Sequence, residues 1–296
     1  MIDLGAGPRV LLLHGQPGSG EDWLAVAERL APSHRVLAPD RPGWGSSTLE
    51  ATSLAGNAAA LAGLLGDDPA ELPTTVAAHS LGGGVALELA LRYPDKVGAL
   101  VLVGSVGVGA ALTGLDRVLA LPVVGEGIVR AGVAVILQAL AAGSRLSDRH
   151  APGRATRRLR DLPTVRAAAG EGGKPLVGRS RRSFIAEQRA LVAETPGLER
   201  RLARISVPVA VVAGTFDRVI PLAAARELAG AIPGAELVVV RGGHMLPIDH
   251  ADEIASVVER YAAMAVLPPR DSRDAGGAGP DQGRPDQNRP GQVLPT

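Results

Sequence analysis

The chain has 296 residues, 46% of them hydrophobic, so it can bury the core of one large domain or of two smaller ones. A formal net charge of +1 and an aromatic content of 2% leave neither a strong field nor a stacking platform, which argues against nucleic-acid or anionic-membrane partners. The absence of cysteine excludes disulfides, thiolate metal sites and a cysteine nucleophile.

The two ends of the chain carry different signals. The start, MIDLGAGPRVLLLHG, lacks the features of a secretory signal, and charged residues interrupt the apolar region around residues 97–143. We therefore expect a cytoplasmic protein without a spanning helix. From Pro268 onward the sequence is rich in Pro, Gly, Asp, Gln and Arg, which predicts a disordered tail over 268–296.

Between these ends, short apolar runs alternate with helical segments. The predicted strands are 9–15, 34–40, 74–80, 97–105, 207–214 and 235–242. The predicted helices are about 21–31, 53–65, 82–93, 221–231 and 251–264. Because the strands are continuous apolar runs, we expect both of their faces to be covered, as in a parallel sheet. The fold class is therefore α/β, a doubly wound and mostly parallel sheet, with ligand sites at the carboxyl ends of its strands.

Ser80 lies where the predicted strand TTVAAHS turns into the predicted helix GGGVALELALRY. A serine nucleophile on a sharp strand-to-helix turn needs small neighbours, and Ala78, Gly82 and Gly83 provide them. Ala78 replaces the first glycine of the usual G-x-S-x-G pattern. A purely structural glycine turn that packs a helix on a strand is the alternative interpretation.

Two further residues follow predicted strands and complete a triad order. Asp217 comes after the strand 207–214, and His244 comes after the strand 235–242. A lone aspartate there is commonly a turn former or helix cap, and a lone loop histidine is commonly solvated. The order Ser80, Asp217, His244 at one edge of the sheet instead favours nucleophile, acid and base.

The segment LLLHGQPGSGEDW supplies a candidate oxyanion hole. We expect the backbone N–H groups of Gln16 and Leu81 to be its donors, because such donors are usually main-chain groups. His14 is interpreted chiefly as a brace for this loop, and Gly15 allows close approach to a ligand. A phosphate loop is discounted, since the G-K-[ST] ending is missing.

Five motifs, HGQPGSG, DRPGWGSS, AHSLGGG, GTFDRVIP and GGHMLPIDH, together resemble the α/β-hydrolase superfamily, in its small serine esterase-like and haloperoxidase-like branch. The resemblance covers about residues 8–107 and 205–265. It implies that Ser80 attacks, that His244 is its base and that Asp217 orients the imidazole. The substrate pocket it implies is lined by His14, Gly15, Trp44, His79, Val219 and Met245.

The resemblance also implies a domain organisation: a core of residues 1–107 and 205–267 with an inserted helical cap over 108–204. Relatives begin with a β-hairpin before the LLLHG strand, whereas only eight residues precede Arg9, so we expect either a truncated start or a lost antiparallel edge. Residues 145–204 carry 14 Arg and one Lys against six acidic residues, a balance of +9. Solvated helix faces explain this surplus, and attraction of an anionic substrate or carrier is the alternative, for which Arg179, Arg181 and Arg182 are the residues to test.

The implied function is a serine hydrolase that cleaves an ester, thioester or lactone bond of a hydrophobic small molecule through an acyl-enzyme, without metal or cofactor. Serine at position 80, in place of a carboxylate, argues against dehalogenase and epoxide hydrolase chemistry. Two alternatives stay open. One is a carbon–carbon bond hydrolase, perhydrolase or lyase of secondary metabolism with the same triad, and the other is a non-catalytic binding protein. The sequence does not indicate the oligomeric state.

Overall fold

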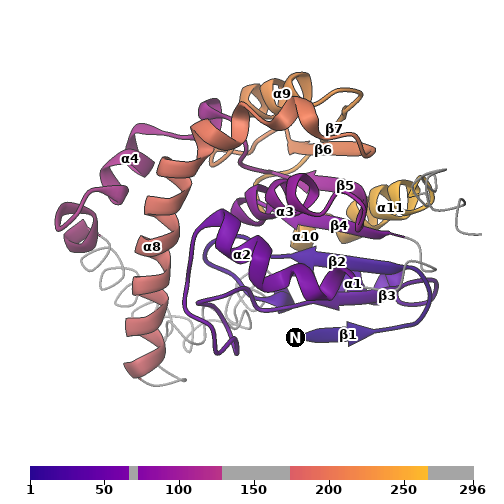
Figure 1. Cartoon of the computed structure of the whole chain (residues 1–296), viewed down its shortest axis with the longest axis horizontal. Helices are drawn as coiled ribbons and strands as arrows, with labels where there is room; N and C mark the ends of the chain where they lie inside the picture. Colours follow the sequence, from indigo (N-terminus) through magenta and orange to yellow (C-terminus); the bar gives the residue numbers. More distant parts are fainter. Residues whose placement is uncertain (67–72, 129–173, 266–296) are drawn as a thin grey trace, which may run out of the picture.

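A seven-stranded sheet forms the centre of the protein, seen in a computed structural model that describes residues 1–66, 73–128 and 174–265 (Figure 1). Its strands are β1 (Ile2–Leu4), β2 (Arg9–Leu13), β3 (Arg35–Ala38), β4 (Thr74–His79), β5 (Val97–Val103), β6 (Val209–Gly214) and β7 (Glu236–Val240). Their spatial order is β1-β3-β2-β4-β5-β6-β7. All neighbours pair in parallel except β1, which is antiparallel to β3. The predicted α/β class with a mostly parallel sheet is confirmed.

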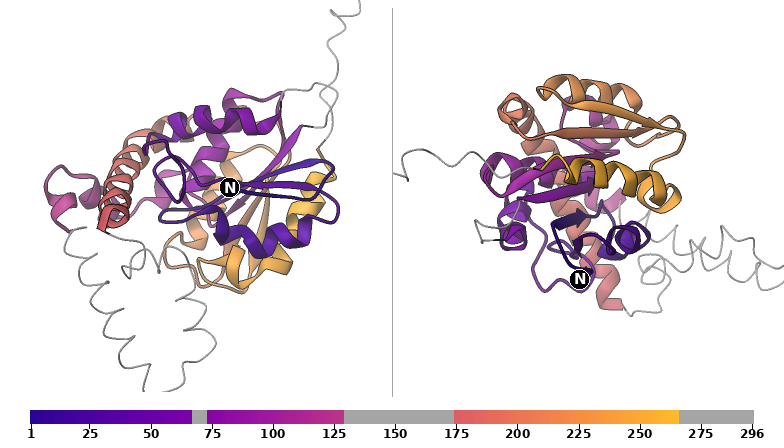
Figure 2. Two further views of the ribbon diagram at one scale, coloured as in Figure 1. Left: turned by 90° about the horizontal axis from the view of Figure 1, so that it is seen from below. Right: turned by 90° about the vertical axis from the view of Figure 1, so that its right-hand side faces the viewer.

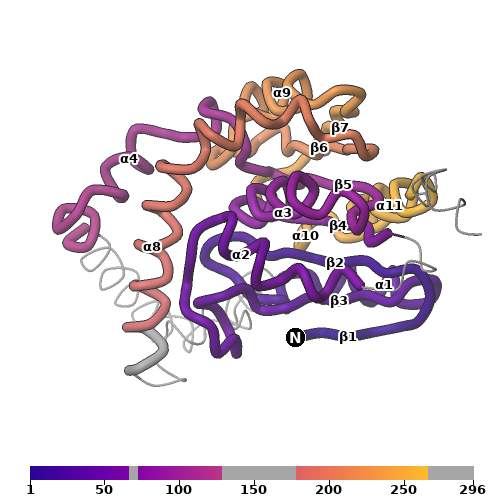
Figure 3. Tube along the Cα trace, viewed as in Figure 1, coloured from indigo at the N-terminus to yellow at the C-terminus, as the bar shows by residue number. Residues whose placement is uncertain are grey.

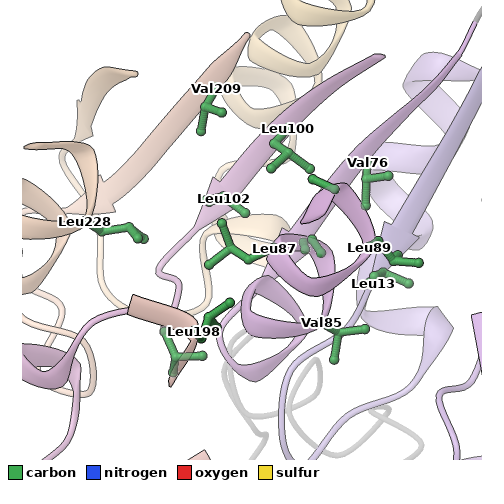
Figure 4. Close-up of a cluster of buried hydrophobic side chains, with 14 of the residues drawn as sticks. Leu13, Val76, Val85, Leu87, Leu89, Leu100, Leu102, Leu198, Val209 and Leu228 are labelled. Carbon is green, nitrogen blue, oxygen red and sulfur yellow. The ribbon is translucent and has the colours of Figure 1, made fainter. Parts of the chain in front are cut away.

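Alternate residues of the strands pack into two separate cores. Leu11 and Leu13 of β2 face one cluster, which also holds the apolar faces of α2 (Leu54–Leu61), α3 (Leu81–Arg92) and α9 (Leu222–Ala231). Figure 4 shows part of this cluster, with Leu87 of α3 on the side of Leu102 and Leu89 on the side of Leu13. Val10 and Leu12 face the other cluster, with α1 (Leu24–Leu30) and α11 (Ala251–Ala262). Figure 2 shows these two helical layers from two further sides.

At the two edges of the sheet the structure differs from the expectations of a lost antiparallel strand and of strands covered on both faces. An antiparallel edge is present: β1 is a single short strand on β3, and its Ile2 and Leu4 are anchored against the α1 side of the core. At the opposite edge, β7 is not covered on both faces as expected, because Val239 is 47% exposed. The reason is its place in the sheet, since β6 is the one strand with which β7 pairs among those that the structure describes.

Helices α4 (Gly114–Ala120) and α8 (Lys174–Glu199) stand beside the sheet and contact each other. The tube in Figure 3 follows the chain from β5 outward to α4, and later inward along α8 to β6. Both helices fall in the segment predicted as a cap. The rest of that prediction, residues 145–173 of the Arg-rich stretch included, lies outside the described residues, as does the predicted tail 268–296.

Candidate active site

Ser80 lies between β4 and α3 in a backbone conformation that L-residues rarely adopt, with φ 54° and ψ −122°. The small residues behind it are required by space. A Cβ at Gly82 would lie 2.5 Å from the carbonyl oxygen of His14, and one at Gly83 would lie 1.7 Å from Ser105 Oγ. Ala78 is fully buried in the regular ladder of β4, so its methyl group is compatible with the turn.

Asp217 and His244 are hydrogen-bonded to each other at the carboxyl ends of β6 and β7. His244 Nδ1 lies 2.8 Å from Asp217 Oδ2, and the other carboxylate oxygen accepts from the backbone N–H groups of Val219 and Ile220 at 2.8 and 2.9 Å. Burial alone would raise the pKa of Asp217, but the His244 hydrogen bond and charge, together with these two amides, outweigh burial and lower it. The carboxylate is therefore ionised and fixes the imidazole with Nδ1 as the donor.

His79, the residue before Ser80, contacts both the backbone and the ring of His244. Its Nε2 donates to the carbonyl oxygen of His244 at 2.8 Å, and the two ring centroids are 4.6 Å apart. Burial, followed by the nearby His244, lowers the pKa of His79 to about 3, so this ring is neutral. The turn that carries Ser80 thus contacts the His244 imidazole through His79. Within the described residues the Ser80 hydroxyl has no hydrogen-bond partner, and its contact with His244 stays a prediction.

The loop after β2 is held by a dense set of hydrogen bonds around His14. Its Nδ1 lies 2.8 Å from the carbonyl oxygen of Gly15, and its Nε2 accepts from the backbone N–H of Arg41 at 2.9 Å. The neutral ring therefore donates from Nδ1, consistent with burial holding the pKa of His14 well below its usual range. The Arg41 side chain adds bonds to the carbonyl oxygens of His14 and Gly15, both at 2.8 Å.

Both candidate oxyanion donors belong to peptide groups whose carbonyl oxygen is held by two hydrogen bonds. The Gly15 carbonyl, in the peptide group of the Gln16 N–H, accepts from His14 and Arg41. The Ser80 carbonyl, in the peptide group of the Leu81 N–H, accepts from two backbone amides at 3.0 and 3.2 Å. Because a trans peptide group is planar, fixing its oxygen also fixes the opposite direction of its N–H. Neither N–H serves as a donor in the turn and loop hydrogen bonds of the described chain.

A buried carboxyl group lies beneath the same loop. Asp22 Oδ2 accepts from the backbone N–H of Ser19 at 3.1 Å, and a Cβ at Gly18 would lie 2.5 Å from this oxygen. Burial raises the pKa of Asp22 to about 6. Its protonation state therefore changes in a pH range where most surface carboxylates are already ionised.

The residues predicted to line a pocket fall into two groups. His14, Gly15, Trp44 and His79 are buried, and each of the three rings uses a nitrogen in an internal hydrogen bond, so these residues also support the site from within. Their place in the pocket lining stays a prediction. Val219 is 52% exposed and Met245 is half-buried beside His244, and for these two residues pocket lining stays a prediction.

Sequence reasoning missed the contacts that α8 makes with the core. Glu187 and Arg41 form a buried ion pair, and Ser183 Oγ donates to the carbonyl oxygen of Gly43. Arg179, singled out as a candidate for anion attraction, instead donates to the carbonyl oxygens of Ser47 and Leu49. No local sequence signal indicates these contacts, because Glu187 lies in a stretch that is typical of an exposed, charged helix.

The sheet order, the strained serine turn and the Asp–His pair after the last two strands define the α/β-hydrolase fold. A sequence profile of the alpha/beta hydrolase family matches residues 10–257, and the chain belongs to this family. The resemblance found in the motifs and the expectation of an α/β-hydrolase enzyme are confirmed.

Three similar proteins illustrate the family. A pimeloyl-[acyl-carrier protein] methyl ester esterase of Xanthomonas axonopodis is 28% identical, covering 88% of this chain and 97% of its own. A thermophilic esterase from Thermogutta terrifontis has a similar structure, with TM-score 0.67, 24% identity, and coverage of 90% and 93%. A meta-cleavage product hydrolase from Pseudomonas fluorescens has TM-score 0.64, 24% identity, and coverage of 88% and 92%. The two structural likenesses show the fold.

Residues 1–66, 73–128 and 174–265 contain neither a candidate metal site nor a membrane-spanning helix. No group of His, Cys, Asp or Glu side chains there could hold a metal ion. Across the same ranges, no helix is long and apolar enough to span a membrane.

Proposed function

We propose that the protein is a serine hydrolase that cleaves an ester, thioester or lactone bond of a hydrophobic small molecule. The observation that carries the proposal is the hydrogen bond from His244 Nδ1 to the ionised Asp217, at the same strand-end edge of the sheet as a serine held in a strained turn. In a neutral imidazole this hydrogen bond keeps the proton on Nδ1, so Nε2 carries the lone pair that a serine nucleophile needs as its base.

In the proposed reaction, Ser80 Oγ attacks the acyl carbon while its proton moves to His244 Nε2. The carbonyl electrons pass to oxygen, and the N–H groups of Gln16 and Leu81 stabilise the resulting negative charge. His244 then returns the proton to the leaving group, which departs as the acyl-enzyme forms. Water then attacks the acyl carbon while its proton moves to His244 Nε2, and the imidazolium returns this proton to Ser80 Oγ as the bond to the acyl carbon breaks and the acid leaves.

Exposed apolar side chains in the described part of the predicted cap support a hydrophobic substrate. Leu115 is 61% exposed, Leu121 is 49% exposed and Val123 is 80% exposed. We assign residues 108–204 to a cap over the site, of which the structure describes the helices α4 and α8. A series of p-nitrophenyl esters from acetate to decanoate tests the substrate class: kcat/KM should increase with chain length until the cavity is filled.

Labelling by a fluorophosphonate tests the nucleophile directly. The wild-type protein should be labelled, the Ser80→Ala variant should not, and a Ser105→Ala variant should be labelled like the wild type. Ser105 is the matched control, because it lies at the end of β5 but donates its hydroxyl to the carbonyl oxygen of Val106. Undiminished labelling of Ser80→Ala overturns the proposal. Labelling at Ser80 without turnover of any ester points to carbon–carbon bond cleavage instead.

A further inference from the structure

Arg41 and Glu187 form an ion pair that is almost completely buried between the core and α8. Their exposed side-chain fractions are 0% and 1%, and the charged groups meet at 2.5 and 3.3 Å. Trp44 Nε1 donates to the same carboxylate at 2.9 Å, and Asn57 Oδ1 accepts from Arg41 at 3.2 Å. A buried ion pair of this kind is poor evidence for stability, because desolvation offsets much of the attraction. The other hydrogen bonds of Arg41 indicate what the ion pair does besides stabilising the fold.

The remaining donors of Arg41 all point at the candidate oxyanion loop. Nε donates to the carbonyl oxygen of His14, and Nη2 donates to that of Gly15. A guanidinium presents its donors in a rigid planar fork, so fixing one side of the fork fixes the other. Glu187 binds Nη1 and Nη2 of the guanidinium, while Nε and Nη2 bind the loop carbonyls.

The Gly15 carbonyl belongs to the peptide group whose N–H comes from Gln16. Because this group is planar, the bond from Arg41 sets the direction of the Gln16 N–H on its other side. Hydrogen bonds to the oxygen also polarise the amide, which strengthens the N–H as a donor. The ion pair is thus one peptide group away from the place where negative charge would develop.

The same face of α8 reaches the loop a second time. The Gln16 side chain donates from Nε2 to the carbonyl oxygen of Phe184 at 2.7 Å, and Phe184 lies one turn before Glu187. Helix α8 therefore contacts the loop both through the Gln16 side chain and, through Arg41, at the peptide group before it.

We propose that Glu187 is a positioning residue, which acts through Arg41 to orient the Gln16 N–H as an oxyanion donor. This inference rests on the proposed function. It makes the predicted cap a part of the catalytic machinery, because a side chain of α8 sets the geometry of a group on the core. The residue touches no reacting atom and is required for transition-state binding more than for substrate binding.

The test compares Glu187→Gln with Glu194→Gln, using the whole chain. Glu194 is the matched control because it lies two turns later on α8 and accepts from the Ala55 backbone N–H, away from the oxyanion loop. With a p-nitrophenyl ester, Glu187→Gln should lower kcat about 30- to 100-fold, since loss of a whole oxyanion donor lowers it about 10²- to 10³-fold. KM should stay within about 3-fold, and the control should match the wild type in both constants.

A pair of inhibitors separates this role from a structural one. An alkyl trifluoromethyl ketone adds Ser80 Oγ to its carbonyl carbon, with the serine proton moving to His244 and the carbonyl electrons to oxygen, whereas the matching methyl ketone binds without this step. Glu187→Gln should weaken the trifluoromethyl ketone by about the same factor as kcat and leave the methyl ketone unchanged. Equal loss for both inhibitors, no loss for either, or the same loss in Glu194→Gln overturns the inference.

Two further measurements keep the result interpretable. Fluorophosphonate labelling of the wild type at Ser80 is scored first, so that a failure of the proposed function is seen separately from a failure of this inference. If Glu187→Gln does not fold, Arg41→Lys takes its place, because lysine keeps the buried charge but lacks the rigid planar fork that joins Glu187 to both loop carbonyls. It should show the same selective loss of trifluoromethyl ketone affinity, and an unchanged ratio of the two inhibitors overturns the inference.

Discussion

Replacing Ser80 by glycine should stabilise the fold relative to replacing it by alanine, although both changes remove the nucleophile. The backbone at this position has φ 54° and ψ −122°, where a side chain costs about 1–3 kcal/mol and glycine costs little. Against this gain, glycine loses about 0.5–1 kcal/mol more backbone entropy than alanine when the chain folds. We therefore expect the free energy of unfolding of Ser80→Gly to be about 1 kcal/mol larger than that of Ser80→Ala.

Urea unfolding at pH 7.5 and 25 °C, followed by circular dichroism, measures this difference. Both variants remove the same hydroxyl, which has no partner within the described residues, so backbone strain is what distinguishes them. The wild type should resemble Ser80→Ala in stability, because serine and alanine share the same steric restriction. If Ser80→Gly is no more stable than Ser80→Ala, the turn at Ser80 is not strained and the reasoning about the strained serine turn is wrong.

Three other changes probe the surroundings of the site. Since burial raises the pKa of Asp22 to about 6 from an ordinary 3.8, the folded state binds its proton more tightly than the unfolded chain does, and stability is lost as pH rises through this window. Asp22→Asn should therefore gain about 3 kcal/mol on the wild type between pH 4 and pH 7 in urea titrations; a constant difference would contradict this. The pKa of His79, lowered to about 3, has the opposite effect, since stability is lost as pH falls from about 6.5 towards 3. His79→Gln keeps a donor for the carbonyl of His244 and should unfold at lower pH than the wild type in an acid titration; an unchanged midpoint would argue against a neutral buried ring. Gly104 has φ +49°, and a Cβ there would lie 3.3 Å from His244 Nδ1, so Gly104→Ala should lower kcat about 10-fold and stability by about 1 kcal/mol. Gly230→Ala, where a Cβ meets no atom within 4 Å, should leave kcat unchanged in the same ester assay, and equal losses in both variants would refute the crowding argument.

The main residues of the candidate site could be predicted because each follows an apolar run that is enough by itself to indicate a buried strand. Ser80, Asp217 and His244 come directly after buried strands, and parallel strands bring their carboxyl ends to one edge. The bracing role expected for His14 could be anticipated in the same local way, because the loop that it holds is adjacent in sequence.

Other features depend on contacts that no local pattern encodes. The pairing of Arg41 with Glu187 joins residues separated by 146 positions, and the sequence around Glu187 is typical of an exposed, charged helix. The strand β1 is three residues long, too short for an alternation signal, and only its pairing with β3 identifies it. The burial of His79 and Trp44 was likewise unpredictable, since a motif gives the place of a side chain along the chain but not the neighbours that cover it.

The position of β7 at the open side of the sheet has a consequence for heat tolerance. Among the described strands, β7 pairs with β6 alone, and the loop that follows it carries His244. Detachment of a sheet margin needs less free energy than melting the whole domain. Warming should thus separate the base from Ser80 while the inner strands and both helical layers persist, and loss of turnover should precede loss of ellipticity by several degrees.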